Sequence, residues 1–471
     1  MDVLASLAAE PSQLLPARTQ MAFTLGFHIV LVPFGVAFTA ITLIANYKGI
    51  KRGDHEALLL AQRWSKVAAV LFAVGAVSGT VLTFEMGLLW PGLMDRFGAA
   101  YGIPFAIEGI FFFIEAIFIA IYIYGWKRMR PWPHFWTGVP VVLSGIGGTL
   151  SVVAANAWMN QPDGFTMKGG EVTDVEPLKV IFNDAFWYEG IHMLLAAYIV
   201  AGFLVASVYA VALLKGRRDR YHRLGFLIPF TVAAIATPLQ MVVGDAAARA
   251  IFHDQPIKFA AMELVPETSS DVPETIGGFY IDGEIRGPKI EIPGLASLLS
   301  DYSTDTEITG FNSVPPEDRP PVNIVHLAWD TMLGIAGFLF LISAWFGFVW
   351  WRRRDIPKSK WFLRAAAIAG VASIVCMWAG WVITEVGRQP WVVYNILRTE
   401  DAVTSASAGG VWLSLSIVIV LYTLVGIATV LVLRSMTKRW RAAGEVEGVP
   451  YGPIVEMTDE KPPARLRGGD A

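Results

Sequence analysis

The sequence predicts an all-α membrane protein, a polytopic bundle of nine transmembrane helices. First, 54% of its 471 residues are hydrophobic and only 16% are charged, a balance typical of integral membrane proteins. Second, nine runs reach the length of about 20 mostly apolar residues that a bilayer-spanning helix needs. Third, the connections between these runs alternate between basic segments and segments that are acidic or poor in Lys and Arg.

The nine runs, in chain order, are expected near residues 21–47, 65–84, 103–126, 136–158, 186–214, 224–245, 324–351, 362–385 and 411–434. They divide the chain into helices 1–6 within 1–245, a long connection at 246–323, helices 7–9 within 324–441, and a polar, Pro-rich tail at 442–471. The long connection is rich in Pro, Glu and Asp, and its segment 278–285 (GFYIDGEI) is predicted to form a hairpin. A connection this long is usually functional or disordered.

The charge pattern orients the bundle. Positively charged connections are retained in the cytoplasm, so the N-terminus is expected outside and the C-terminus inside, which an odd number of spans requires. The basic set comprises Lys48, Lys51, Arg52, Arg63, Lys66, Lys127, Arg128, Arg130, Lys215, Arg217, Arg218, Arg220, Arg223, Arg352, Arg353, Arg354, Lys358 and Lys360, followed by Arg434, Lys438, Arg439 and Arg441 after the last run. Residues 1–18 have no basic region before their short apolar stretch, so no cleavable signal peptide is expected.

Composition also excludes several functions. A net charge of −3 gives no electrostatic support for nucleic-acid binding. The single cysteine, Cys376, excludes a disulfide within the chain, a CxxCH haem attachment and a cysteine zinc site.

The eighth run ends in an unusual polar stretch, from Glu385 through Gly387, Arg388 and Gln389 to Pro390. A carboxylate at the end of a membrane helix is costly unless it is paired or binds something. Gly387 and Pro390 break the helix, so the side chains of Arg388 and Gln389 can direct donors toward a ligand at the helix mouth. The alternative is an ordinary polar helix end with an interfacial tryptophan.

Further candidate ligands fall in the predicted outer half of the membrane, each on a different helix: His28, Glu108, His192, Met332 and Glu385. Taken singly, a histidine or methionine on an apolar helix is more often a packing residue. Two histidines, a methionine and carboxylates at one depth suggest buried metal centres. Because no cysteine cluster is present and 12% of residues are aromatic, haem is the favoured cofactor, and His and Met are common axial ligands.

Glu115 follows Glu108 by seven residues, which returns it to nearly the same helix face, about 10 Å deeper along the axis. Two carboxyls on one face suit a proton relay, although a structural carboxyl pair is the alternative. In the long connection, Lys258 and Glu263 lie on an amphipathic segment just after a span. They suit binding and deprotonation of a quinol at the interface, although such a pair is more often part of a solvated face.

At this point the sequence resembles subunit I of the cytochrome bd-type quinol oxidases over nearly all nine spans. The Gly387-Arg388-Gln389-Pro390-Trp391 string after an intramembrane glutamate is the specific signal. The other motifs that carry the resemblance are Arg18-Thr19-Gln20 through His28 and Pro33, Ala106 to Gly109, Ala154 to Met159, Phe182 to His192, Lys258 to Glu263, and Gly380 to Trp391.

The resemblance implies specific roles. His192 and Met332 would ligate a low-spin haem b, and His28 and Glu385 would be the protein ligands of the other two haems, a high-spin haem b and either haem d or a third haem b. The resemblance leaves open which of His28 and Glu385 holds the O₂-reducing haem. Roles around the haems and the substrate follow as a set: Glu108 near the oxygen site, Glu115 on the proton path, Trp381 between haems, Arg18 and Arg388 with Gln389 at the haem propionates, and Lys258 and Glu263 at the quinol.

The sequence also departs from the family. In many relatives an arginine stands two residues before the ligating methionine, where this chain has Asp330. Many relatives space the two carboxylates of the third helix by eight residues rather than seven. The outer loop lacks a long extension found in some relatives, and with Trp391-Val392-Val393-Tyr394 the chain looks like the branch that includes the cyanide-insensitive oxidases.

The implied function is oxidation of membrane quinol at the outer face and reduction of O₂ with cytoplasmic protons, in a bacterial-type cell membrane. This generates proton-motive force without pumping. The resemblance implies a second membrane subunit, subunit II, and allows a small single-helix accessory subunit. Two alternatives stay open: a proton-coupled membrane transporter, and a haem-b electron-transfer subunit that does not reduce O₂.

Overall fold

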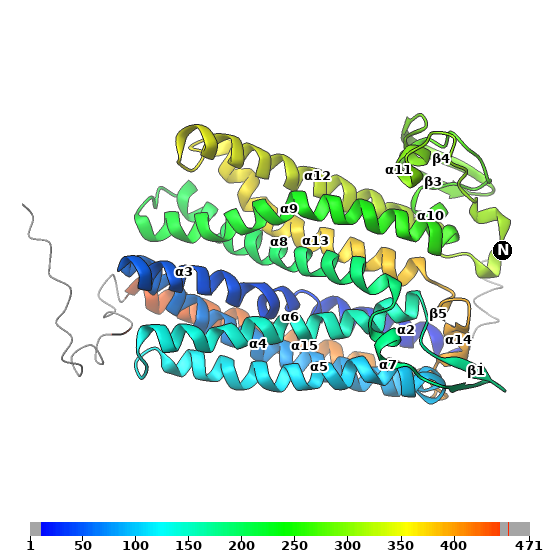
Figure 1. Ribbon diagram of the computed structural model, residues 1–471, viewed down its shortest axis with the longest axis horizontal. Coiled ribbons are helices and arrows are strands. Elements are labelled where there is room, and N and C mark those ends of the chain that lie inside the picture. Colours follow the sequence, from blue (N-terminus) through cyan, green and yellow to red (C-terminus); the bar gives the residue numbers. More distant parts are fainter. Residues whose placement is uncertain (1–10, 443–450, 452–471) are drawn as a thin grey trace, which may run out of the picture.

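The computed structural model describes residues 11–442 and residue 451. Long helices run side by side along the long axis of the molecule, as Figure 1 shows. Among the described residues, eight helices are long and apolar enough to cross a membrane, judged by length and composition. This confirms the prediction of an all-α membrane bundle. The predicted number of nine spans depends on whether the first run, at 21–47, crosses the membrane.

The elements in chain order are α2 (Leu14–His28), η1 (Phe34–Phe38), α3 (Thr39–Arg52), α4 (His55–Leu89), α5 (Pro91–Gly125), α6 (Pro131–Asn160), β1 (Thr166–Lys168), β2 (Glu171–Thr173), α7 (Pro177–Ile181), α8 (Asp184–Leu214), α9 (Arg220–Asp254), α10 (Pro256–Met262), β3 (Glu274–Ile281), β4 (Glu284–Ile292), α11 (Leu295–Asp301), η2 (Phe311–Ser313), η3 (Pro316–Asp318), α12 (Val322–Arg353), α13 (Lys360–Gly387), β5 (Trp391–Val393), β6 (Leu397–Arg398), α14 (Thr399–Ala402) and α15 (Ala408–Ala442).

The first predicted span is not one continuous helix. The run at 21–47 is covered by α2, a π-helical segment η1 and α3, with turns directly after His28. Pro33 explains the break, because its ring clashes with the carbonyl four residues earlier, at residue 29, and it has no N–H to donate. The interruption leaves His28 as the last residue of α2.

Two packed groups of helices make the bundle. In one, α8 packs against α9 and α13, and α12 packs against α13 and α9, around buried phenylalanines such as Phe203 and Phe230. In the other, α5 packs against α6 and α4, and both α2 and α15 pack against α4. Contacts of α6 with α8 join the groups.

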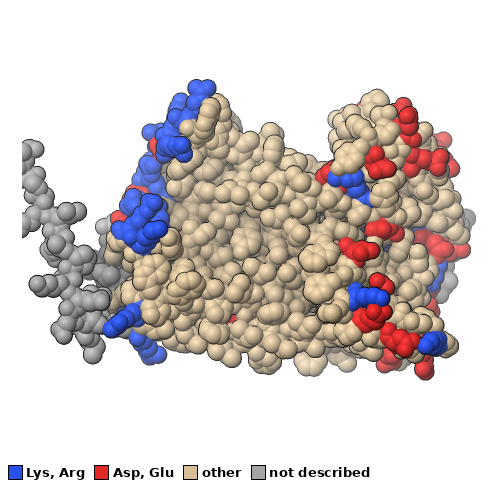
Figure 2. Space-filling view, in the orientation of Figure 1, with Lys and Arg blue, Asp and Glu red and all other residues tan. Residues whose placement is uncertain are grey.

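Charge separates along the bundle axis. Figure 2 shows Lys and Arg gathered at one end, Asp and Glu gathered at the other, and a band between them of other residues. At the basic end, Asp54 caps α4 by accepting a hydrogen bond from the backbone N–H of Ala57 at 3.3 Å, and Arg220 of α9 pairs with the same carboxylate at 2.5 Å. The two groups of helices are therefore linked there by an ion pair.

The long connection lies at the acidic end and is ordered. It is shorter than the predicted 246–323, because α9 continues to Asp254 and α12 begins at Val322. The predicted hairpin is confirmed: β3 and β4 pair antiparallel around Asp282 and Gly283, both with positive φ, as a two-residue turn requires. Of the predicted tail at 442–471, all but residues 442 and 451 lie outside the described residues.

Candidate functional site

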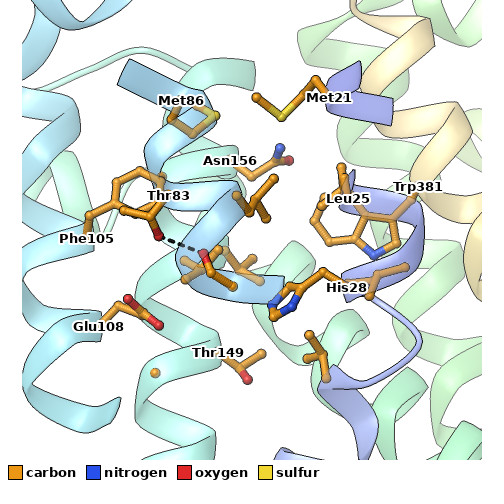
Figure 3. A pocket seen from close by; sticks show the side chains of 18 of the residues that line it. Met21, Leu25, His28, Thr83, Met86, Phe105, Glu108, Thr149, Asn156 and Trp381 are labelled. Atoms are coloured by element: carbon orange, nitrogen blue, oxygen red, sulfur yellow. Dashed lines mark hydrogen bonds between the residues drawn. The ribbon is translucent and has the colours of Figure 1, made fainter. Parts of the chain in front are cut away.

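A cavity of about 540 Å³ lies inside the acidic half of the bundle, between α2, α4, α5, α6 and α13. Its volume is in the range of cofactor and ligand pockets. Figure 3 shows His28, Glu108, Asn156 and Trp381 around this space. Eight of the twelve predicted site residues line the cavity: Arg18, His28, Glu108, Glu115, Trp381, Glu385, Arg388 and Gln389. The other four, His192, Met332, Lys258 and Glu263, are not among its lining residues.

His28 is oriented by its neighbours on α4. Its Nδ1 lies 2.8 Å from the hydroxyl of Ser78, and that hydroxyl donates to the carbonyl of Gly75 at 3.1 Å. Because the hydroxyl proton is used, His28 Nδ1 must donate to Ser78, which leaves Nε2 as an acceptor. Gly79 packs against the ring: a Cβ there would lie 3.1 Å from His28 Cε1. The ring thus has the fixed tautomer and free nitrogen of a metal-ligating histidine.

Glu385 is held from two sides near the end of α13. Asn156 of α6 donates to one carboxylate oxygen, and Arg388 donates to the other at 2.8 Å. The helix ends at Gly387, whose missing side chain gives room to Lys258; a Cβ there would lie 2.9 Å from Lys258 Cγ. The carboxylate is therefore oriented toward the cavity with its charge compensated.

Arg388 is the strongest cofactor-binding candidate. Its side chain is only 1% exposed, yet Nε and Nη1 have no hydrogen-bond partner among the described residues. Buried guanidinium donors without partners are costly, so an anionic group of a ligand is expected there. Nearby, Arg18 donates to the Gln389 side-chain oxygen at 3.1 Å, and the Thr399 hydroxyl donates to that same oxygen at 2.8 Å.

Glu108 and Glu115 both line the cavity from one face of α5, as their spacing predicts. Glu115 Oε1 is buried with no hydrogen-bond partner among the described residues and faces Gly35 of η1. The described residues contain no group of three or more His, Cys, Asp or Glu side chains suited to one metal ion. The donors are single ligands from separate helices, which suits a metal held by a macrocycle.

His192 and Met332 lie outside the cavity, on α8 and α12. His192 Nδ1 is buried without a hydrogen-bond partner among the described residues, and a Cβ on Gly244 of α9 would lie 3.4 Å from the ring. A Cβ on Gly380 of α13 would lie 3.3 Å from the Met332 sulfur. Trp381, the next residue, lines the cavity and packs against the hydrophobic cluster that contains Met193.

Lys258 and Glu263 are both buried, at 3% and 4% exposure, which rules out the solvated-face alternative. They face different neighbours: Lys258 donates to the Thr384 carbonyl at 3.4 Å, whereas Glu263 lies beside Glu274 and Trp329. Burial lowers the pKa of Lys258 to about 8, opposed by the nearby charge of Glu189. Burial also raises the pKa of Glu263 well above its usual range, and the Glu274 carboxyl acts in the same direction.

The sequence analysis did not single out two further carboxyl residues of the membrane helices, Glu85 and Glu189. Glu85 of α4 is 4% exposed and accepts hydrogen bonds from Gln20 at 2.8 Å and Thr24 at 3.0 Å. It was missed because the predicted span stopped at residue 84, whereas α4 continues to Leu89. Glu189 accepts from Asn160 at 2.9 Å, and its position one helical turn before His192 was an available signal.

Comparisons with known proteins identify the family of the chain. The family model "Cytochrome bd terminal oxidase subunit I" matches residues 16–440. A Bacillus subtilis (strain 168) relative, provisionally named a cytochrome bd menaquinol oxidase subunit I, is 34% identical over 84% of this chain and 90% of its own length. Cytochrome bd ubiquinol oxidase subunit 1 of the same organism is 29% identical over 88% and 91%.

The fold matches a solved structure as well. The bd oxidase from Geobacillus thermodenitrificans is similar with a TM-score of 0.85 and 32% identity, covering 91% of this chain and 99% of the matched one. The family model spans the cavity, the polar end of α13 and the long connection together. The chain therefore belongs to the cytochrome bd terminal oxidase subunit I family.

Proposed function

We propose that this chain is the haem-bearing subunit of a membrane quinol:O₂ oxidoreductase that oxidises quinol at its outer face and reduces O₂ to water with cytoplasmic protons. The observation that carries the proposal is the single cavity in which His28, Glu385 and Arg388 meet, in a chain of this family. These residue types fit haem, because an imidazole nitrogen and a carboxylate can approach iron while a guanidinium with unpartnered donors can meet a propionate.

The residues divide by role. His28 and Glu385 would hold haem iron in the cavity, as haem b paired with haem d or a further haem b, and His192 with Met332 would hold the low-spin haem b. When bound, the haems supply the redox-active iron for electron transfer and O₂ reduction. Arg388, with Arg18 and Gln389 beside it, would bind the propionates, and Trp381 would lie between the haems.

Proton handling falls to the chain itself. Lys258 and Glu263 would bind quinol at the outer end and accept its protons, since a base must take a proton from each hydroxyl. Glu115 and Glu108 would carry protons from the cytoplasmic side toward the cavity along one face of α5. Because release and uptake then occur on opposite sides, the reaction generates proton-motive force without a pump.

The proposal includes an orientation and partners. The basic end of Figure 2 would face the cytoplasm, in a bacterial-type cell membrane, with the interrupted α2–η1–α3 run as the first of nine spans. On α5, Ile110, Phe113 and Ile117 form an exposed apolar stripe at helical spacing. This stripe and the exposed apolar face of α15 are available to subunit II, to a small single-helix accessory subunit, or to lipid.

The test compares two electron donors in purified complex. Glu263→Gln should depress O₂ consumption driven by reduced quinol by about 100-fold or more, the contribution of a general base. Haem content, and O₂ consumption driven by a small one-electron donor that releases no protons, should stay at the wild-type level. An unaltered quinol-driven rate would count against the assignment.

The two alternative functions have separate signatures. A proton-coupled transporter would purify without colour. An electron-transfer subunit that does not reduce O₂ would carry haem b but would show no quinol-driven O₂ consumption.

A further inference from the structure

A cluster of acidic residues and one histidine lies beneath the hairpin at the outer end of the bundle. Its members come from three elements: Glu263 follows α10, Glu274 begins β3, and His326 and Asp330 stand one turn apart on α12. Glu263 and Glu274 are 4% and 6% exposed, and His326 is fully buried. Such a concentration of buried ionisable groups is expensive unless it has a task.

The two glutamates form a carboxyl pair. Their side chains are within hydrogen-bonding reach, and two carboxyl groups can bond only if one of them keeps its proton. The second oxygen of Glu263, Oε2, is buried and has no hydrogen-bond partner among the described residues. The indole of Trp329 approaches Glu263 but is not in hydrogen-bonding geometry, so a donor and an acceptor remain for a substrate. Burial raises the pKa of both glutamates.

His326 joins two backbone carbonyls beneath the hairpin. Its Nδ1 lies 2.8 Å from the Met262 carbonyl oxygen, and its Nε2 lies 3.0 Å from the Gly277 carbonyl oxygen. Carbonyl oxygens only accept, so both ring nitrogens of His326 are placed as donors to the backbone. Asp330 lies 3.5 Å from Nε2 and accepts from the backbone N–H of Gly277 at 2.7 Å.

The same contacts fix the hairpin on α12. Asn323 accepts from the Tyr280 N–H at 2.7 Å and donates to the Tyr280 carbonyl at 2.9 Å. With His326 bridging the end of α10 to β3, the position of Glu274 beside Glu263 is set by the backbone. On β4, Lys289 and Glu291 pair with each other at 2.5 Å. Among the residues that the structure describes, the other ionisable groups that act on the carboxyl pair are Asp330 and His326.

We propose that Glu274 is a further proton-accepting residue of the quinol site, acting with Glu263 as a pair that holds one shared proton, and that His326 is the positioning residue that holds this pair together. This rests on the proposed function of Glu263. Oxidation of each quinol breaks two O–H bonds and removes two electrons, which the oxidase reaction takes up. The singly protonated pair accepts the two hydroxyl protons one after the other on its free carboxylate oxygen, and it releases the first toward the outer face before it accepts the second.

The experiment uses the purified complex and two matched variants in one hairpin. Glu274→Gln keeps the size and hydrogen-bonding capacity of the side chain but cannot exchange a carboxyl proton. Glu291→Gln makes the same change on β4, opposite Thr275, outside the cluster. Glu274→Gln should lower the maximal quinol-driven rate about tenfold or more, and Glu291→Gln should leave it unchanged. Haem content and the rate with a one-electron donor should not change in either variant.

The dependence of the quinol-driven rate on pH separates proton transfer from a structural role. A pair titrates in two macroscopic steps and a single carboxyl in one, so the Glu274→Gln profile should show one ionisation fewer than the wild-type profile. Glu274→Asp should restore the second ionisation. A Glu274→Gln enzyme with wild-type turnover and both ionisations would overturn the inference, as would a rate loss with both ionisations retained.

The failures of the two proposals are distinguishable. If Glu263→Gln lowers the quinol-driven rate and Glu274→Gln does not, the proposed quinol site is supported and the proposed carboxyl pair is rejected. If neither variant lowers it, the proposed quinol site itself is wrong.

Discussion

Gly79 offers a direct test of the His28 assignment without changing the histidine. In Gly79→Ala, the new Cβ would lie 3.1 Å from His28 Cε1, tighter than ordinary van der Waals contact, so the ring must yield by a few tenths of an ångström. Overpacking of this kind costs about 1–3 kcal/mol. If His28 binds haem iron through Nε2, this penalty weakens the site by about 5- to 150-fold, since 1.4 kcal/mol corresponds to tenfold.

The matched control is Gly75→Ala, one turn earlier on α4. Gly75 lines the same cavity, but its Cβ would lie 3.8 Å from Leu31 Cβ, an ordinary contact, so the His28 ring should not be displaced. The assay is the haem content of purified complex, with carbon monoxide difference spectra to report the open haem position. Gly79→Ala should lose haem signal at low haem supply, whereas Gly75→Ala should match wild type. Equal spectra for all three proteins would refute the assignment of His28.

Three further predictions follow from the same geometry. Arg388→Leu should leave the Glu385 carboxylate without its arginine partner, lowering stability by about 1.5–3 kcal/mol, measured as a lower thermal midpoint together with reduced haem retention. Burial lowers the pKa of Lys258 to about 8 in the folded protein, from 10.5 in the unfolded chain. Between pH 8 and 10.5 the unfolded chain therefore binds more protons, so the free energy of unfolding should rise with pH by about 3 kcal/mol. Lys258→Met should abolish this rise, which thermal midpoints measured across the pH range would show. His192→Ala and Met332→Leu should each remove the low-spin haem b band from reduced-minus-oxidised spectra; a retained band would reject those ligands.

Much of the bundle was predictable, because a membrane-spanning helix makes its backbone hydrogen bonds internally and can be recognised from the length and hydropathy of its sequence. The hairpin was predictable from Asp282-Gly283, a two-residue turn that needs positive φ at both positions. The break after His28 was not predicted, because hydropathy does not register the effect of Pro33 on the carbonyl of residue 29. Its consequence is functional, since the break places His28 at the end of α2.

The sequence predicted many of the residues of the candidate site, but it did not predict which of them lie together. Polar side chains in lipid-embedded helices signal function individually, which identified His28, Glu108 and Glu385. Their convergence on one cavity depends on how separate helices pack against each other. Sequence spacing predicts only which residues share a face of the same helix. Likewise, the spacing of His326 and Asp330 places them on one helix face, but only the fold shows the Gly277 backbone and Glu274 of the hairpin beside them.

The most direct test of the central claim, that polar residues of this chain bind haem for a quinol oxidase, is a pyridine haemochrome spectrum of the purified complex, read together with its quinol-driven O₂ consumption. The account predicts haem b, alone or with haem d, in a complex that consumes O₂ when given reduced quinol. A complex that retains wild-type subunit composition but contains no haem would contradict it.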